Sequence, residues 1–261
     1  MPNFNAALKN AAHWTPVFAS DHFPHVSSWT LARTTYQPVP CSKSVNGLVR
    51  IGTELMRDLL IHLETNPDVV AIAEYPEEAE YWTIATNGEP TVRNHVPAVA
   101  VLTIDGSVAV IDVMSAEAQE KSSAFVDQRT CDLTDHYEAL GASYVLLDET
   151  TVRKQPMFDN RRHMWALRKT KYQNPEIDRL AVLILRERLP LSIGEFARRT
   201  MSAASLKQGP DPIGLVYSAV TQLAIAGRIQ IDLGSPLSDS TMIRAARRHS
   251  IDQRDLTPLA A

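Results

Sequence analysis

Two apolar runs on either side of Asp105-Gly106 constrain the fold of this chain more than any other feature. Residues 96–104 and 107–114 are rich in Val and Ile, which favour strands. An Asp-Gly dipeptide tolerates the positive φ angles of a tight turn, so the two runs are predicted to pair as an antiparallel hairpin. Both runs are almost wholly apolar, and we therefore expect both faces of the hairpin to be covered.

The segments around this hairpin predict a mixed α/β layer. Upstream, residues 45–63 space apolar side chains at intervals of three and four, as one buried helix face requires. The apolar positions are Leu48, Ile51, Leu55, Leu59 and Leu63. Glu54 lies one residue off this face. Downstream, residues 132–141 predict a helix ending at Gly141, and a short strand is expected at residues 144–147.

Four pieces of sequence occur in a recognisable order: the helix carrying Glu54, the turn at residues 66–78, His95-x-Pro97, and Ile111-Asp112-Val113. Over roughly residues 40–170 this order resembles the N-terminal domain of TnsA-type transposon endonucleases, of the PD-(D/E)xK nuclease superfamily. The resemblance implies a restriction-endonuclease-like mixed sheet for residues 45–172. It also implies a metal site built from a helix Glu, an Asp after the Pro, and an acid-x-Lys pair.

The positions that the resemblance assigns to this site hold Glu54, Ala98, Asp112 and Met114. Ala98 supplies none of the hard oxygen ligands that Mg²⁺ requires, and Met114 supplies no ammonium group to offset charge on the phosphorane. We therefore expect a pseudonuclease without a cofactor. Glu54 and Asp112 remain as the candidate catalytic and metal residues if the chain is an active endonuclease using Mg²⁺ or Mn²⁺.

Composition points to a cytoplasmic protein of two domains. The 261 residues are 44% hydrophobic, enough for substantial cores. No run of about 18 apolar residues and no leader-like N-terminus occurs, so no membrane association is expected. Two cysteines, Cys41 and Cys131, form no disulfide framework. The aromatic-rich residues 1–44 are interpreted as an N-terminal extension that drapes over a domain or a partner.

Charge is divided unevenly between the two halves of the chain. Residues 1–150 carry 8 Lys and Arg against 20 Asp and Glu, whereas residues 151–261 carry 18 against 10. Only the second half suits a polyanion, and double-stranded DNA is the partner we expect for it. The alternative is that the acidic and basic halves attract each other within a monomer or a homodimer. The sequence does not decide between these two oligomeric states.

The basic half contains three predicted helices followed by a strand. Asn174 and Pro175 begin a helix that reaches residue 188, and Ser192 with Glu195 forms a capping box for a helix to about residue 201. A third helix, about 213–226, ends at Gly227, and residues 228–233 alternate as a strand before a turn at 234–239. Residues 173–243 resemble a winged-helix DNA-binding domain, a kind also found in TnsA-type proteins, and residues 244–261 form a tail.

If the third helix enters the major groove, its polar side chains can reach base edges. These are Tyr217, Ser218, Thr221 and Gln222. The helix lacks Arg and Lys, so phosphate contacts are expected from flanking cations. These are Arg198, Arg199, Lys207 and Arg228, with Arg244, Arg247 and Arg248 near the end. The basic segment 151–172, with Arg161 and Arg162, predicts a helix that packs on the first domain or lies along DNA phosphates.

The leading functional hypothesis is a DNA-binding protein with a degenerate nuclease fold and a winged helix. It would act in regulation or in nucleoprotein assembly on a mobile element, with further protein partners. One alternative is an active metal-dependent DNA endonuclease of a mobile element. Another is a protein-assembly adaptor, which predicts no salt-sensitive DNA binding.

Overall fold

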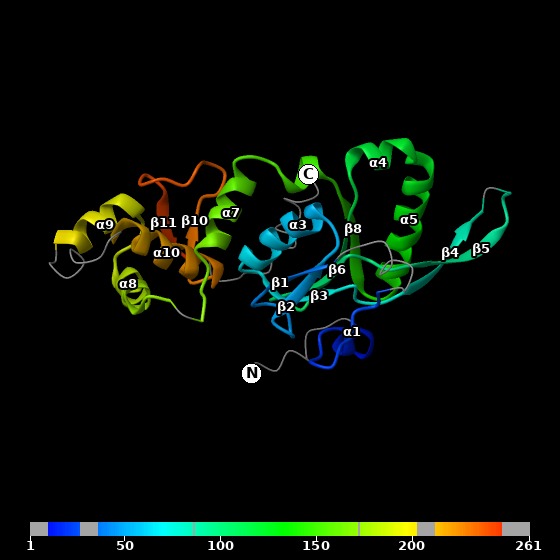
Figure 1. The fold of residues 1–261 in the computed structure, drawn as a ribbon, viewed down its shortest axis with the longest axis horizontal. Coiled ribbons are helices and arrows are strands. Elements are labelled where there is room, and N and C mark those ends of the chain that lie inside the picture. The colour runs from blue at the N-terminus through cyan, green and yellow to red at the C-terminus, as the bar shows by residue number, and fades with distance from the viewer. Residues whose placement is uncertain (1–9, 27–35, 86, 172, 203–211, 247–261) are drawn as a thin grey trace. The chain divides into compact units, whose positions relative to one another are not determined.

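The chain folds into two compact units (Figure 1). The computed structural model describes residues 10–26, 36–85, 87–171, 173–202 and 212–246. Among these, the first unit contains residues 10–63 and 68–152, and the second contains residues 64–67 and 153–246. No helix in the described part of the chain is both long enough and apolar enough to span a bilayer.

The first unit is a mixed α/β layer, as the sequence predicts. In chain order it contains α1 (Ala11–Val17), β1 (Gln37–Pro40), β2 (Leu48–Ile51), α3 (Glu54–Thr65), β3 (Val69–Glu74), β4 (Ala79–Ile84), β5 (Pro90–His95), β6 (Val99–Thr103), β7 (Val108–Val113), α4 (Ala116–Lys121), α5 (Ser123–Ala139), β8 (Ala142–Leu147) and α6 (Glu149–Val152). The central sheet has the order β3-β6-β7-β8. Its first three strands are antiparallel, and β8 is parallel to β7.

The predicted hairpin is confirmed as β6 and β7. Gly106 adopts a φ of 84°, and the Asp105 carboxylate accepts hydrogen bonds from Thr103 and Ser107 on either side of the turn. Both faces of the hairpin are covered, as expected. Val99, Val101, Ala109 and Ile111 pack with α3, whereas Ala100, Leu102, Val108 and Val110 pack with α5. Strict alternation along each strand therefore assigns every side chain to one of two opposite cores.

The helix predicted over residues 45–63 is wrong in its first part. Residues 48–51 form strand β2, which pairs with β1, and Leu48 is largely exposed. The helix begins at Glu54, where the Thr53 hydroxyl accepts a hydrogen bond from the Met56 amide. Alternating Val and Ile fit a strand as well as a helix over so few residues, and the capping threonine decides where the helix starts.

Part of the predicted N-terminal extension belongs to the first unit. Trp14 on α1 is completely buried, and its indole NH donates a hydrogen bond of 2.9 Å to the Leu140 carbonyl. Strand β1 also lies within this extension and pairs with β2. Trp14 therefore belongs to the core of the first unit, and β1 to one of its sheets.

The second unit contains the three predicted helices and more strand than expected. Its elements are α7 (Met157–Ala166), α8 (Pro175–Arg186), β9 (Leu191–Ser192), α9 (Ile193–Ser202), α10 (Pro212–Ile225), β10 (Ile229–Ile231) and β11 (Met242–Ala245). The strands form an antiparallel sheet with the order β10-β11-β9. The predicted caps at Asn174 and Ser192 are present, accepting from the amides of Glu176 and Glu195. Gly227 has a φ of 65°, as a helix-ending glycine requires.

The basic segment 151–172 does not form the single helix that was predicted. Its helical part is broken between α6 and α7, around Pro156, a residue that cannot donate a backbone hydrogen bond. Helix α7 lies in the second unit, with Met164 in the core formed by α8, α9 and α10. The division at residue 152 therefore differs from the predicted boundary at residue 172.

Candidate functional site

Asp112, the candidate metal ligand on β7, is a buried carboxylate with three hydrogen-bond donors. His95 Nε2 lies 2.5 Å from Oδ2, the Tyr144 hydroxyl donates to Oδ2 at 2.7 Å, and the Ala98 amide donates to Oδ1 at 2.9 Å. Burial acts to raise the pKa of Asp112, but the hydrogen bond and charge of His95, with the other two donors, hold that pKa below its usual value. The ionised carboxylate of Asp112 thus links β7 to Tyr144 on β8, to His95 at the end of β5 and to Ala98 just before β6.

Glu54 and Asp112 lie on opposite sides of the central sheet. Asp112 follows Val108 and Val110 in the strand alternation and bonds Tyr144, so it belongs to the α5 side. Glu54 is exposed at the start of α3, which packs on the other side. The structure therefore does not bring these two predicted site residues together. Sequence analysis could not predict this separation, because β7 is almost wholly apolar and its alternation marks no polar face.

The strand positions on the α3 side of the sheet carry no metal ligands at this end of the hairpin. Ala98, Ile111 and Val113 pack with the α3 core. Met114 is half-buried, and its amide donates to the Leu147 carbonyl. No group of three or more His, Cys, Asp or Glu in the described residues is arranged to hold a metal ion.

Of the four side chains predicted to read bases on α10, two are buried and two are half-buried with hydrogen-bond partners in the second unit. Thr221 is 2% exposed and Ser218 9%. The Gln222 amide donates to the Leu167 carbonyl, and the Tyr217 hydroxyl donates to Asp239. Burial and this last hydrogen bond raise the pKa of Tyr217 to about 12. Ser218 and Thr221 are thus not available to base edges in this structure, whereas base reading by Tyr217 and Gln222 stays a prediction.

Helix α7 contacts the loop between β10 and β11, and the sequence did not reveal this. The buried Asn160 donates to the carbonyls of Leu233 and Ser235, and its side-chain oxygen accepts from the Leu237 amide. Its side chain therefore fixes the loop between β10 and β11. A single asparagine within a basic segment carries no sequence signal for contacts this distant.

Residues 64–67 also belong to the second unit, and two of them contact side chains of α7. The buried Glu64 accepts a hydrogen bond of 2.6 Å from the Trp165 indole and pairs with Arg168 at 3.5 Å. Arg168 lies 3.9 Å from the Trp165 ring centroid, and Arg161 donates to the Thr65 carbonyl. Arg161, a predicted phosphate contact, is thus used within the protein.

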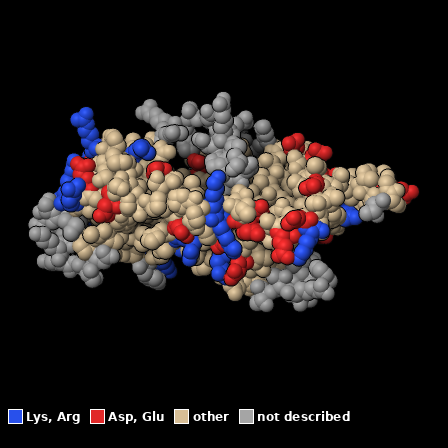
Figure 2. Space-filling model, turned by 90° about the horizontal axis from the view of Figure 1, so that it is seen from above, with Lys and Arg blue, Asp and Glu red and all other residues tan. Residues whose placement is uncertain are grey.

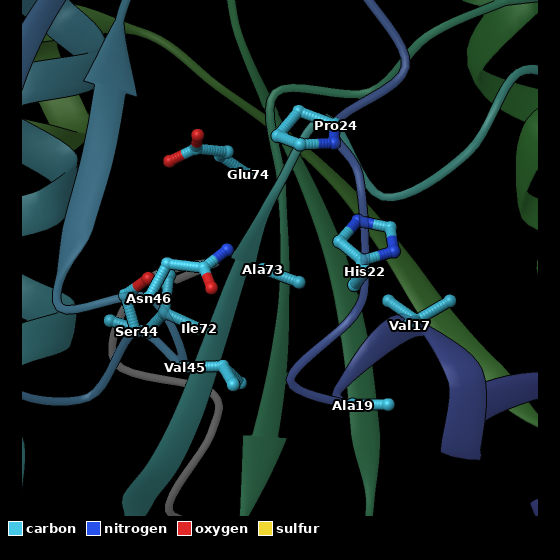
Figure 3. Close-up of a pocket in the computed structure, with 10 residues that line it drawn as sticks. All are labelled: Val17, Ala19, His22, Pro24, Ser44, Val45, Asn46, Ile72, Ala73 and Glu74. Carbon is cyan, nitrogen blue, oxygen red and sulfur yellow. The ribbon is translucent and has the colours of Figure 1, made fainter.

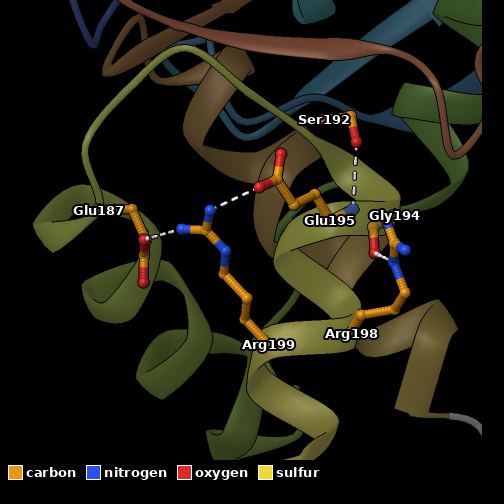
Figure 4. Close-up of polar contacts among 6 residues, drawn as sticks. All are labelled: Glu187, Ser192, Gly194, Glu195, Arg198 and Arg199. Carbon is orange, nitrogen blue, oxygen red and sulfur yellow. Dashed lines mark hydrogen bonds and ion pairs between the residues drawn. The ribbon is translucent and has the colours of Figure 1, made fainter.

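The other predicted phosphate contacts on α7 and α9 differ in the partners that their side chains have. Arg199 pairs with Glu187 and Glu195, and Arg198 bonds the Gly194 carbonyl of its own helix (Figure 4). Arg162 pairs weakly with Asp159 at 3.7 Å. All of these arginines are exposed, so their ion pairs are screened and exchangeable. Lys207, Arg247 and Arg248 lie outside the described residues.

The outer side of the β10–β11 hairpin carries polar side chains with no partner among the described residues. Gln230 lies directly opposite Arg244, and Arg228 precedes Gln230 by two residues. All three are exposed, whereas Ile229, Ile231 and Ile243 point into the core. We call Arg228, Gln230 and Arg244 the hairpin stripe. On the face drawn in Figure 2, Lys and Arg elsewhere lie beside Asp and Glu without forming one broad basic area.

One small pocket of the first unit lies between α1, the segment after it, and β3 (Figure 3). His22 and Glu74 are among its lining residues, and burial with the nearby charge of His25 lowers the pKa of His22. The pocket has room for about one water molecule. It is too small to serve as a small-molecule site.

No protein-family model matches this chain, and no curated protein matches it. Its function therefore has to be argued from the geometry of the two units.

Proposed function

We propose that this chain is a DNA-binding protein whose first unit has a nuclease-like fold that does not cleave phosphodiesters and whose second unit is a winged helix. It acts in regulation or in nucleoprotein assembly. The observation that carries the proposal is the hairpin stripe, where Arg228 and Arg244 stand exposed on a strand pair without partners among the described residues. Exposed arginines on a rigid hairpin suit phosphate contacts.

The topology of the second unit supports the winged-helix assignment. Helix α8, strand β9, helices α9 and α10, and the β10–β11 hairpin follow one another, and β11 lies between β10 and β9. The hairpin corresponds to the wing. Because Ser218 and Thr221 of α10 are buried, we place the DNA contact on the wing and on exposed arginines of α9 such as Arg198.

The first unit supports the nuclease-like part of the proposal by its element order. Helix α3 precedes β3, β6 and β7 of the mixed sheet, and α5 precedes β8. The β4–β5 ribbon is inserted between β3 and β6, and α4 between β7 and α5. The separation of Glu54 from Asp112 by the sheet supports a role without cleavage. Such a unit would serve as a scaffold for assembly.

The proposal is tested by the salt dependence of binding to double-stranded DNA, measured by fluorescence anisotropy with the full chain. We expect affinity to fall steeply between about 50 and 200 mM salt, as counterion release requires. Undetectable binding at 50 mM salt would refute it.

The burial of α10 favours one competing function, a protein-assembly adaptor. A three-helix unit that buries polar side chains of its third helix, here Ser218 and Thr221, can present its outer surfaces to another protein. This function predicts no binding to DNA at low salt, so the same titration separates the two.

A further inference from the structure

Two arginines of the first unit converge on one exposed aromatic ring. Arg93 lies on β5 and Arg129 on α5, and their Cζ atoms are 5.0 and 6.0 Å from the centroid of the Phe125 ring. Phe125 is 47% exposed. Helix α5 packs against β4 at the base of the β4–β5 ribbon, which Figure 1 shows leaving the central sheet beside α5. Ribbon and helix thus place two cations at one half-exposed position.

Neither guanidinium forms an ion pair with any residue that the structure describes, and Arg129 Nε is buried without a hydrogen-bond partner. Asp132 lies one helical turn after Arg129, but its Oδ1 is occupied by Gln128 at 2.8 Å and its Oδ2 is unpartnered. In contrast, Arg50 of the same unit binds Glu74 through both its backbone and side chain. Two arginines on one ring, without ion-pair partners among the described residues, are unusual in a half of the chain with 20 acidic and 8 basic residues.

An anion bound at this ring would compensate the positive charge that the two guanidinium groups bring to it. The planar donor fork of arginine matches the oxygens of a phosphate, and contact with the Phe125 ring holds each guanidinium in place. The exposed part of Phe125 and the guanidinium planes also offer surfaces on which a base can stack. We propose that Arg93, Arg129 and Phe125 form a binding site for a phosphate group, either free or within a nucleic-acid strand. The site lies in the first unit and does not depend on the winged helix.

The test observes the arginine side chains directly, by the Nε–Hε resonances of the ¹⁵N-labelled full chain during titration with inorganic phosphate. Sodium chloride at matched ionic strength is the reference. We expect saturable shifts for Arg93 and Arg129 and none for Arg57 on α3. The Arg57 side chain donates a hydrogen bond to Gln37 on β1 and lies away from Phe125 in the sequence. Arg93→Gln or Arg129→Gln should each weaken phosphate binding about tenfold, whereas Arg57→Gln should not. Backbone amide spectra check that each variant is folded.

A strand of single-stranded DNA about ten nucleotides long then distinguishes the two sources of phosphate. This arm uses the Arg228→Gln/Arg244→Gln background, so that the hairpin stripe does not contribute. Displacement of phosphate by the oligonucleotide assigns the site to a nucleic-acid strand, and phosphate binding without displacement assigns it to a free phosphate compound. Shifts that are unsaturable, or equal in chloride, would overturn the site and leave DNA binding by the second unit untouched.

Discussion

The side-chain amide of Asn160 on α7 donates a hydrogen bond of 2.9 Å to the backbone carbonyl of Leu233, in the loop that follows β10. Two further bonds, to Ser235 and from Leu237, complete the contact between α7 and this loop. Because Asn160 is only 5% exposed, no water replaces these bonds while the contact persists. These three hydrogen bonds thereby hold the loop of the proposed wing against helix α7.

Asn160→Ala is expected to destabilise the second unit by about 2–3 kcal/mol, because it leaves buried carbonyl and amide groups without partners. Chemical denaturation followed by tryptophan fluorescence measures this loss, since Trp165 lies in the same unit. Asn94→Ala, at an exposed position of β5, is the matched control and should change stability by less than about 0.5 kcal/mol. Equal effects of the two variants would mean that the α7 contact contributes nothing.

Asp112→Asn is expected to destabilise the first unit by about 2–3 kcal/mol near neutral pH, because it removes a buried carboxylate with three hydrogen-bond partners. The folded pKa of Asp112 is below its unfolded value, so the carboxylate stabilises the fold fully above about pH 5, and this contribution is lost as the pH falls through the folded pKa. Urea unfolding at pH 7 and pH 3 should therefore show a smaller difference between variant and wild type at pH 3. A difference independent of pH would show that the charge of Asp112 is unimportant.

The full chain is expected to leave supercoiled plasmid intact in the presence of Mn²⁺, because the sheet separates Glu54 from Asp112. Gel electrophoresis of the plasmid after incubation measures nicking directly. Nicking that disappears in both Glu54→Ala and Asp112→Ala would restore the endonuclease hypothesis. Nicking that survives both changes would indicate a contaminant or a different site.

Two substitutions on α10, Thr221→Lys and Ile213→Lys, test whether the face of α10 that carries Thr221 is buried in the unit or is free to contact DNA. Thr221 is 2% exposed and Ile213 45%. We expect Thr221→Lys to cost more than about 3 kcal/mol, because it buries an unpaired ammonium group, and Ile213→Lys to be nearly neutral. Thermal unfolding compares the two variants. A stable Thr221→Lys protein with stronger DNA binding would mean that α10 is open to the groove.

Local signals in the sequence predicted much of the fold. The turn at Gly106, the helix end at Gly141 and the caps at Asn174 and Ser192 are where the sequence predicts them. Each depends on a backbone geometry or a short-range hydrogen bond that few residue types supply. Strand β9 was missed because two residues are too short for any periodic pattern.

The candidate site was harder to predict, since it depends on which way side chains face. An almost wholly apolar β7 gives no alternation, so the side of the sheet that Asp112 occupies could not be known. Helix α10 has only four polar side chains, and the exposure of each depends on how other helices, above all α8, pack against α10. Contacts made by Asn160 and Arg93 join distant segments, and no local pattern encodes them.

The hairpin stripe is tested most directly by the slope of log binding constant against log salt concentration for double-stranded DNA, in wild type and in Arg228→Gln/Arg244→Gln. Exposed Lys121→Gln on α4 is the control. If both arginines contact phosphates, the slope of the double variant should be shallower by about 1.8, and affinity should fall for all sequences alike. An unchanged slope and affinity would contradict DNA binding through this hairpin.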